Sequence, residues 1–326
     1  MNLFWKKLFG KLTSTAKFET ELNQFQTDME RYFAVKESVE LSEYKDLSRT
    51  LGSVNIKEEK KKLEKAGSQD TDEYKKIVRF ETLKNNIDIQ FYLRQKPDNF
   101  ETYYPFKKSF SEEFDWNVLS KSNWNFGFYQ KSPSLIGDYS LVNEKQANNS
   151  GENISVFNGV LRLATNHEKV KARAWDATKG FIEREYEYTS DIMQSGAKFS
   201  QKYGIFQAKI RCTGKINHAF WLASEDRLPL VEVFHYDGKA IKLGVTDKKG
   251  KAQQKIAGLN PSGFFIYTLM WSEKEMVWMI NNQVVYRTSN HIPHEKMYLG
   301  FNSFIAEKQK AAKGLLEVDW VRVYSK

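Results

Sequence analysis

Two side chains that can exchange protons lie close together in an apolar run of the sequence. Glu232 and His235 are three residues apart in the segment LVEVFHY, residues 230–236. Residues two apart on a β-strand share a face, and a β-bulge brings a further residue back onto that face. Such a strand would turn Glu232 and His235 toward one ligand, where both could hydrogen-bond to hydroxyl groups. The alternative is a polar pair whose hydrogen bonds are satisfied on a sheet that binds nothing.

The other reactive residue types do not form a second site. Cys212 is the only cysteine, which excludes an internal disulfide, and no pattern of histidine and aspartate around it indicates a nucleophile. We expect no cofactor and no metal ion. The net charge of +9 comes from 50 basic and 41 acidic residues that are interleaved along the chain. Such interleaving is typical of a solvated surface and, without any nucleic-acid-binding motif, argues against a nucleic-acid partner.

The elements around this pair have the pattern of short β-strands. From Pro105 to the C-terminus, alternating apolar and aromatic runs are separated by turns rich in Asn, Gly, Ser and Lys. Asn158-Gly159 supplies a tight hairpin turn within NISVFNGVLRLAT, and Asn281-Asn282 supplies another further along. Many short strands at this spacing predict an antiparallel sandwich over residues 108–326 and exclude a parallel α/β sheet.

Residues 1–107 predict a separate helical region. They contain almost no Gly or Pro, helical patterns begin at Lys17 and Ser42, and Thr71 suits a helix N-terminus. A weak internal repeat suggests stacked helix pairs. The repeat aligns Tyr32, Lys36 and Tyr44 with Tyr92, Lys96 and Tyr104. Because no pattern for catalysis occurs here, we interpret the region as a scaffold that docks a protein partner.

The first 12 residues, MNLFWKKLFGKL, are amphipathic. They suit either a helix on a membrane surface or partner, or an ordinary helix packed on its neighbours. Lys6 and Lys7 interrupt the apolar run that a secretory signal needs, and no run in the chain reaches the ~20 apolar residues that cross a bilayer. We therefore expect no transmembrane segment, and either a cytoplasmic protein or a component of a phage particle.

The order of the strand motifs resembles that of the family-16 glycoside hydrolases. The segment FSEEFDWNVLSKSNW (residues 110–124) is similar to the family's opening strand, and Tyr139 and Asn143 precede a similar strand, turn and strand. The segments YTSDIMQSGAKFSQKYGIFQAKIR (188–211), HAFWL (218–222) and the closing LEVDWVRVYSK follow in the family's order. This resemblance implies a concanavalin-A-like jelly roll over residues 108–326, with a glycan groove on its concave sheet.

The resemblance places the family's catalytic strand just after HAFWL. The family motif there, Glu-x-Asp-x-x-Glu, supplies two carboxyl groups ~5–5.5 Å apart for retaining hydrolysis. In this alignment Leu230 takes the nucleophile position, Glu232 the central Asp position and His235 the acid/base position. Leucine has no oxygen with which to attack an anomeric carbon. Ile192, where the family has Arg, also departs from the pattern, as does HAFWL, which lacks the family's Trp-Pro.

A second alignment keeps hydrolysis open. Shifting the motif by two residues makes Glu232 the nucleophile, puts Phe234 at the Asp position and leaves Asp237 as the acid. This shift breaks the similarity of the flanking residues. The first alignment therefore predicts a degenerate site, and the second an active hydrolase of β-glycans.

Aromatic side chains indicate where a glycan would lie, because sugars stack on Trp and Tyr. Trp271 and Trp320 lie within regular strand patterns and are expected in the core. The candidate carbohydrate-binding residues are Trp175, Trp221, Tyr236 and Asn143. Three functions follow, in order of preference: non-catalytic polysaccharide binding, a structural part of a phage or cell surface, and hydrolysis with Glu232 as a carboxylate.

Overall fold

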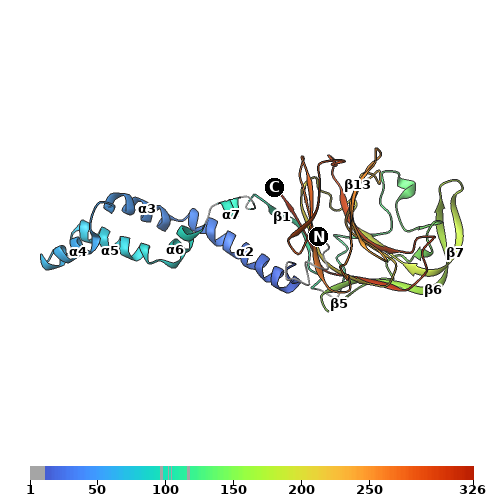
Figure 1. Ribbon diagram of the computed structural model, residues 1–326, viewed down its shortest axis with the longest axis horizontal. Helices are drawn as coiled ribbons and strands as arrows, with labels where there is room; N and C mark the ends of the chain where they lie inside the picture. The colour runs from blue at the N-terminus through green and yellow to red at the C-terminus, as the bar shows by residue number, and fades with distance from the viewer. Residues whose placement is uncertain (1–11, 96–97, 102, 104, 116–117) are drawn as a thin grey trace. The chain divides into compact units, whose positions relative to one another are not determined.

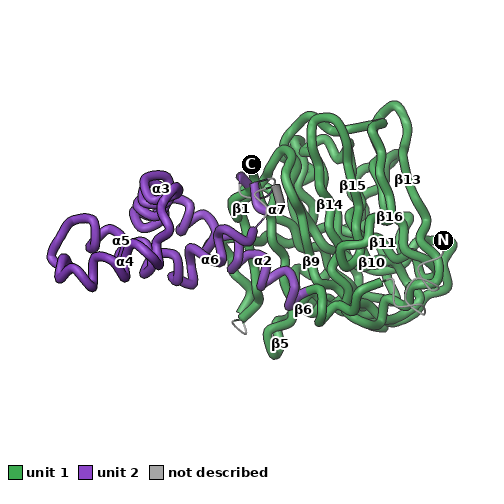
Figure 2. Tube along the Cα trace, turned by 60° about the vertical axis from the view of Figure 1, so that its left-hand side comes forward, with its two compact units in different colours: residues 1–18, 106–326 green, residues 19–105 purple. Residues whose placement is uncertain are grey.

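The chain divides into two compact units. A computed structural model describes residues 12–326 except 96–97, 102, 104 and 116–117. One unit comprises residues 106–326 with the N-terminal segment up to Phe18, and the other comprises Glu19–Pro105 (Figure 2). The amphipathic segment lies outside the described residues, apart from Leu12, which packs in the core of the first unit. None of the described helices is both long and apolar enough to cross a membrane.

The second unit is helical, as predicted (Figure 1). Its elements, the first of which begins in the other unit, are α2 (Thr15–Lys36), α3 (Val39–Leu51), α4 (Ile56–Lys65), α5 (Asp72–Lys84), α6 (Ile87–Arg94) and α7 (Asp98–Glu101). Thr71 caps α5, as its sequence position indicates, by accepting a hydrogen bond from the Tyr74 N–H. Helix α4 has no buried residue, which explains its run of charged side chains.

Aromatic stacking holds the helices together. Tyr32 and Tyr92, which the internal repeat aligns, stack with ring centroids 4.8 Å apart, and Tyr44 stacks on Phe80 at 5.5 Å. Two of the other aligned residues, Lys96 and Tyr104, lie outside the described residues. The helix-pair repeat therefore stays a prediction.

The described strands form two antiparallel-dominated sheets that pack face to face, and the predicted sandwich is confirmed. The larger sheet runs in the order β16 (Gln283–Thr288), β15 (Met276–Ile280), β14 (Phe265–Trp271), β9 (Gly204–Thr213), β18 (Gly314–Ser325), β6 (Val160–Asp176), β7 (Gly180–Ser190) and β4 (Gln146–Asn148). At its margin, β1 (Lys107–Glu112) pairs with β18, while β3 (Ser140–Leu141) and β5 (Ile154–Phe157) pair with β6.

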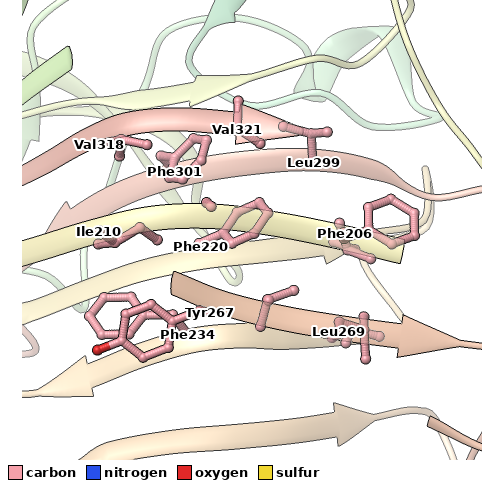
Figure 3. Close-up of a cluster of buried hydrophobic side chains, with 14 of the residues drawn as sticks. Phe206, Ile210, Phe220, Phe234, Tyr267, Leu269, Leu299, Phe301, Val318 and Val321 are labelled. Carbon is pink, nitrogen blue, oxygen red and sulfur yellow. The ribbon is translucent and has the colours of Figure 1, made fainter. Parts of the chain in front are cut away.

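The smaller sheet carries the residues of chemical interest. Its order is β13 (Lys251–Ile256), β12 (Ile241–Thr246), β11 (Leu230–Asp237), β10 (Asn217–Ala223), β17 (Tyr298–Phe304), β8 (Ile192–Gln194) and β2 (Asn125–Phe126). Apolar side chains from both sheets fill the space between them (Figure 3). Trp271 and Trp320 are buried, as expected. The predicted hairpin turns are also present, since Asn158, Gly159, Asn281 and Asn282 all have positive φ.

A segment distant in sequence completes the sandwich. The Asn281 side chain donates through Nδ2 to the Thr13 carbonyl at 3.0 Å, and the Thr15 hydroxyl donates to the Phe264 carbonyl at 2.5 Å. Phe18 packs on Ile266 and Trp320 and is 7% exposed. These contacts explain why the residues before Glu19 belong to the sandwich unit.

We predict that Phe18→Ala destabilises the sandwich by about 3 kcal/mol, because it empties a buried ring site. Urea unfolding followed by tryptophan fluorescence measures this, since residues 19–105 contain no tryptophan and the signal reports on the sandwich. Phe157→Ala is the matched control, because Phe157 is 56% exposed. Equal effects of the two substitutions would show that the N-terminal segment adds nothing to the sandwich.

Candidate functional site

A β-bulge in β11 sets the geometry of the site. Trp221 on β10 pairs with Glu232, and the residue before it, Phe220, pairs with Phe234. Val233 is therefore the extra residue. Val233 and Phe234 are both buried in the core. Leu230, Glu232 and His235 consequently lie on the opposite face of the sheet, which we call the cleft face. The sequence pattern had predicted this arrangement.

The cleft face is hollowed into a cavity of about 250 Å³. Strands of the smaller sheet and two turns supply its walls, and Leu230, Glu232 and His235 all contribute to them. The other lining residues are Phe128, Tyr129, Gln130, Ile192, Ala219, Trp221, Ala223, Arg227, Tyr298, Asn302 and Phe304. Most of these side chains are apolar or aromatic, as in sites that bind small molecules.

Glu232 and His235 are bound to each other and to fixed neighbours. His235 Nδ1 lies 2.5 Å from Glu232 Oε1, and His235 Nε2 lies 2.9 Å from Asn217 Oδ1. Asn217 offers its oxygen because its Nδ2 donates to Gln309 Oε1 at 2.6 Å. The side chains of Glu232 and His235 are only 15% and 13% exposed. Both ring nitrogens of His235 therefore have acceptors within the protein.

Two glycines flank the pair formed by Glu232 and Trp221. One row across the smaller sheet consists of Gln253, Gly244, Glu232, Trp221 and Gly300. Because Gly244 has no side chain, Gln253 reaches across it and donates to Glu232 Oε2 at 2.9 Å. A Cβ on Gly300 would lie 2.4 Å from the indole ring of Trp221, so the ring lies directly on this glycine.

The indole of Trp221 is fixed at the cavity wall. Its Nε1 donates to Asn302 Oδ1 at 3.0 Å, and the edge of Tyr298 meets it with ring centroids 5.7 Å apart. The Tyr298 hydroxyl in turn donates to the Tyr129 carbonyl at 2.7 Å. A preorganised aromatic surface of this kind suits the apolar face of a sugar ring.

Three of the predicted carbohydrate-binding residues lie elsewhere. Tyr236 is on the core side of β11 and packs against the hydrophobic core. Trp175, expected in a loop, lies near the end of β6. Its ring packs in a T-shaped arrangement with that of Phe181, and the ring centroids are 4.9 Å apart. Asn143 is exposed between β3 and β4, and its carbonyl accepts a hydrogen bond from the Glu307 N–H. Only Trp221 of the four lines the cavity.

The shifted alignment does not fit this geometry. It would need Phe234 in the cleft, whereas Phe234 is fully buried against Tyr267 in the core. Asp237, its acid, lies at the end of β11 and is paired with Lys242 at 3.0 Å. Partial burial acts to raise the pKa of Asp237, but hydrogen bonds from the Ala240 N–H and Lys242 outweigh it and lower this pKa to about 2. A carboxyl group with so low a pKa is a poor general acid.

The sequence patterns missed the residues that the turns contribute. Phe128 and Gln130 follow β2, and Arg227 lies in the turn between β10 and β11. Irregular segments have no periodicity that would indicate which side chains face a cavity. Ile192, noted because it replaces the family's Arg, does line the cavity. Among the described residues, no cluster of His, Cys, Asp and Glu could hold a metal ion.

Solved structures show which class of fold this is. The catalytic domain of a laminarinase from Thermotoga petrophila RKU-1 superposes with a TM-score of 0.53 over 68% of this chain and 98% of that one, at 19% identity. A mutant of SCLam, a non-specific endo-β-1,3(4)-glucanase, superposes with a TM-score of 0.54 at 22% identity, over 68% of this chain and 95% of that one. That mutant structure holds 1,3-β-D-cellobiosyl-glucose at its active site. The fold is thus that of the glucanase jelly-roll sandwiches.

The chain belongs to the glycosyl hydrolases family 16, whose family pattern matches residues 142–322, more than half of its length. It is 28% identical over 247 residues to the endo-1,3-1,4-beta-glycanase EglC of Rhizobium meliloti (strain 1021), which is 67% of this chain and 51% of that relative. It is 24% identical over 268 residues to the kappa-carrageenase of Pseudoalteromonas carrageenovora, covering 66% and 63%. The chain spans about half the length of EglC.

We predict that Gly300→Ala displaces the Trp221 indole and destabilises the sandwich by about 1–3 kcal/mol, as overpacking does. Near-ultraviolet circular dichroism reports the ring and urea unfolding reports the stability. Gly263→Ala is the matched control, because its Cβ would meet only Phe265, at 3.8 Å. If the two variants behaved alike, Trp221 would not depend on Gly300 for its position.

Proposed function

We propose that this chain binds a β-glycan in the cavity of the cleft face without hydrolysing it. The observation that carries the proposal is the occupancy of the motif positions. Leu230 stands at the nucleophile position, and His235, at the acid/base position, is held between Glu232 and Asn217. The family and the fold suggest a glycan ligand. Leu230 and His235, at the two catalytic positions, argue against turnover.

The chemistry of retaining hydrolysis supports the non-catalytic part of the proposal. That reaction needs one carboxyl group as nucleophile and a second, ~5–5.5 Å away, as acid and base. Glu232 is the one carboxylate among the described residues that line the cavity. Its two oxygens are already engaged, Oε1 by His235 and Oε2 by Gln253. A carboxylate held in this way is better suited to positioning neighbouring groups than to attacking a substrate.

The cavity also offers what a sugar ring needs for binding. Trp221 presents an immobilised indole. The side-chain oxygen of Asn302 accepts a hydrogen bond from this indole, so the Asn302 amide lies beside the ring. Asn302 Nδ2 has no hydrogen bond to any described residue, so it can donate to a sugar hydroxyl. Leu230 and Ile192 add apolar surface to the cavity wall. A stacked ring with a few polar contacts is the usual form of a small-ligand site.

We also propose that the helical unit docks a protein partner. The observation that favours this role is the exposure of apolar side chains on its helices: Val39 is 79% exposed, Ile87 72% and Leu93 51%.

Trp221→Ala should weaken binding of laminarin about tenfold or more, because it removes the main stacking surface. Isothermal titration calorimetry measures the affinity. Trp175→Ala is the matched control, since Trp175 lies away from the cavity and its loss should leave the affinity unchanged. Loss of binding in the Trp175 variant alone would move the glycan site to the β6–β7 hairpin.

The unaltered chain should release no reducing ends from laminarin, lichenan, agarose or carrageenan. Loss of the nucleophile removes most of a barrier reduction that spans ~8–23 kcal/mol in enzymes. The double substitution Leu230→Glu with His235→Glu is the minimal attempt to restore turnover. Turnover by the unaltered chain that disappears in Glu232→Gln would contradict the proposal and establish Glu232 as a catalytic carboxylate.

A further inference from the structure

The cavity contains a guanidinium group that no carboxylate neutralises by contact. Arg227 is exposed and lines the cavity together with Trp221 and Leu230. Its side-chain contacts are a hydrogen bond from Nη2 to the Tyr139 hydroxyl at 3.2 Å and the face of the Phe128 ring, 5.3 Å from the guanidinium carbon. Within the described residues it forms no ion pair. Its charge is therefore available to a ligand.

Buried aromatic side chains hold this guanidinium in place. Tyr139 is only 3% exposed and stacks on Phe128 with ring centroids 4.5 Å apart. Its hydroxyl accepts from Gln130 Nε2 at 3.0 Å as well as from Arg227. Two donors on one buried oxygen fix the direction from which the arginine approaches. The support comes from the 128–139 segment, while Arg227 itself comes from the β10–β11 turn.

The backbone of Arg227 is held in an unusual conformation. Its φ of 66° lies in the left-handed region, which residues other than Gly, Asn and Asp rarely adopt. The Arg227 N–H donates to the Ser224 carbonyl at 3.0 Å, and the Ser224 hydroxyl donates to the Leu228 carbonyl at 2.7 Å. Strained conformations of this kind persist where the surrounding structure enforces them, and they cluster at ligand sites.

Among the described residues, the carboxyl groups near the cavity form no ion pair with Arg227. Burial raises the pKa of Glu144 to about 7, although Gln146 and Arg227 act to lower it. Glu144 thus carries only part of a negative charge near neutral pH. Glu232 is engaged by His235 and Gln253, and Glu225 accepts a hydrogen bond from the Tyr129 hydroxyl at 3.2 Å. Among the described residues, each of these carboxyl groups thus has partners other than Arg227.

We infer that Arg227 binds an anionic group, a carboxylate or a sulfate, on a sugar ring that stacks near Trp221. This inference rests on the proposed glycan binding and names the ligand class as acidic glycans. The planar guanidinium can donate two parallel hydrogen bonds to such a group, which a neutral sugar cannot match. Arg227 would then set the preference among glycans, while Trp221 supplies affinity for all of them.

The test uses three ligands on one backbone: laminarin, laminarin oxidised to the carboxylate at C6, and sulfated laminarin. Calorimetry at fixed ionic strength should show that the full chain binds at least one charged form about tenfold or more tightly than laminarin. The two charged ligands distinguish a uronate site from a sulfate site. Arg227→Gln should abolish the preference by lowering the affinity for the charged forms far more than the affinity for neutral laminarin, whereas Arg227→Lys should keep part of the preference.

Arg173→Gln is the matched control, because the Arg173 guanidinium also lies over a phenylalanine ring, Phe181 at 3.5 Å, but does not line the cavity. If Arg173→Gln lowered the preference for the charged ligands as much as Arg227→Gln does, the overall charge of the protein, and not the site, would cause the preference. That result would overturn the inference. Equal loss of neutral and charged binding in Arg227→Gln would overturn it as well. If neutral laminarin binds in a way that depends on Trp221 but the charged forms bind no more tightly, this inference is wrong and the proposed function stands. If no form binds at all, the proposed function falls with it.

Discussion

One extra residue in one strand determines what the cleft of this protein contains. Val233 interrupts the pairing of β11 with β10, so that Glu232 and His235 share a face although they are three residues apart. The indole of Trp278, which belongs to the opposite sheet, donates to the Glu232 carbonyl at 2.9 Å and ties this bulge to the core. Without the bulge, His235 would point into the core and Phe234 into the cleft. The side chains that line the cavity on β11 depend on this local geometry.

The geometry of the bulge and the chemistry of hydrolysis are physically separable. A bulge needs only backbone hydrogen bonds and packing of Val233 and Phe234, whereas hydrolysis needs oxygen atoms at two exact places. Leu230 is half-buried at the edge of the cavity, where an apolar side chain does not disturb the strand. The space around Trp221 depends in the same way on Gly300, not on the catalytic positions. The proposed loss of hydrolysis is therefore compatible with the cleft that the structure shows.

Strand periodicity and turn residues were sufficient to predict the sandwich, whereas the position of the motif came from the resemblance to the family. Asn158-Gly159 and Asn281-Asn282 specify tight turns through positive φ, and alternation then assigns Leu230 and Glu232 to one face. The same alternation, counted across the bulge, places Tyr236 on the core side of the strand. The prediction of Tyr236 as a carbohydrate-binding residue overlooked this consequence. Arg227, Phe128 and Gln130 could not be found, because their positions depend on contacts between turns that are distant in sequence. The packing of Phe18 against Ile266 and Trp320 likewise has no local signal.

We propose that the cleft binds a glycan and does not cleave it. A crystal structure of the chain after prolonged incubation with a laminarin oligosaccharide tests both halves at once. We expect an intact oligosaccharide with one ring on the Trp221 indole, and we expect His235 to keep its hydrogen bonds to Glu232 and Asn217. A shortened oligosaccharide, or a covalent bond between a sugar carbon and a Glu232 oxygen, would contradict it.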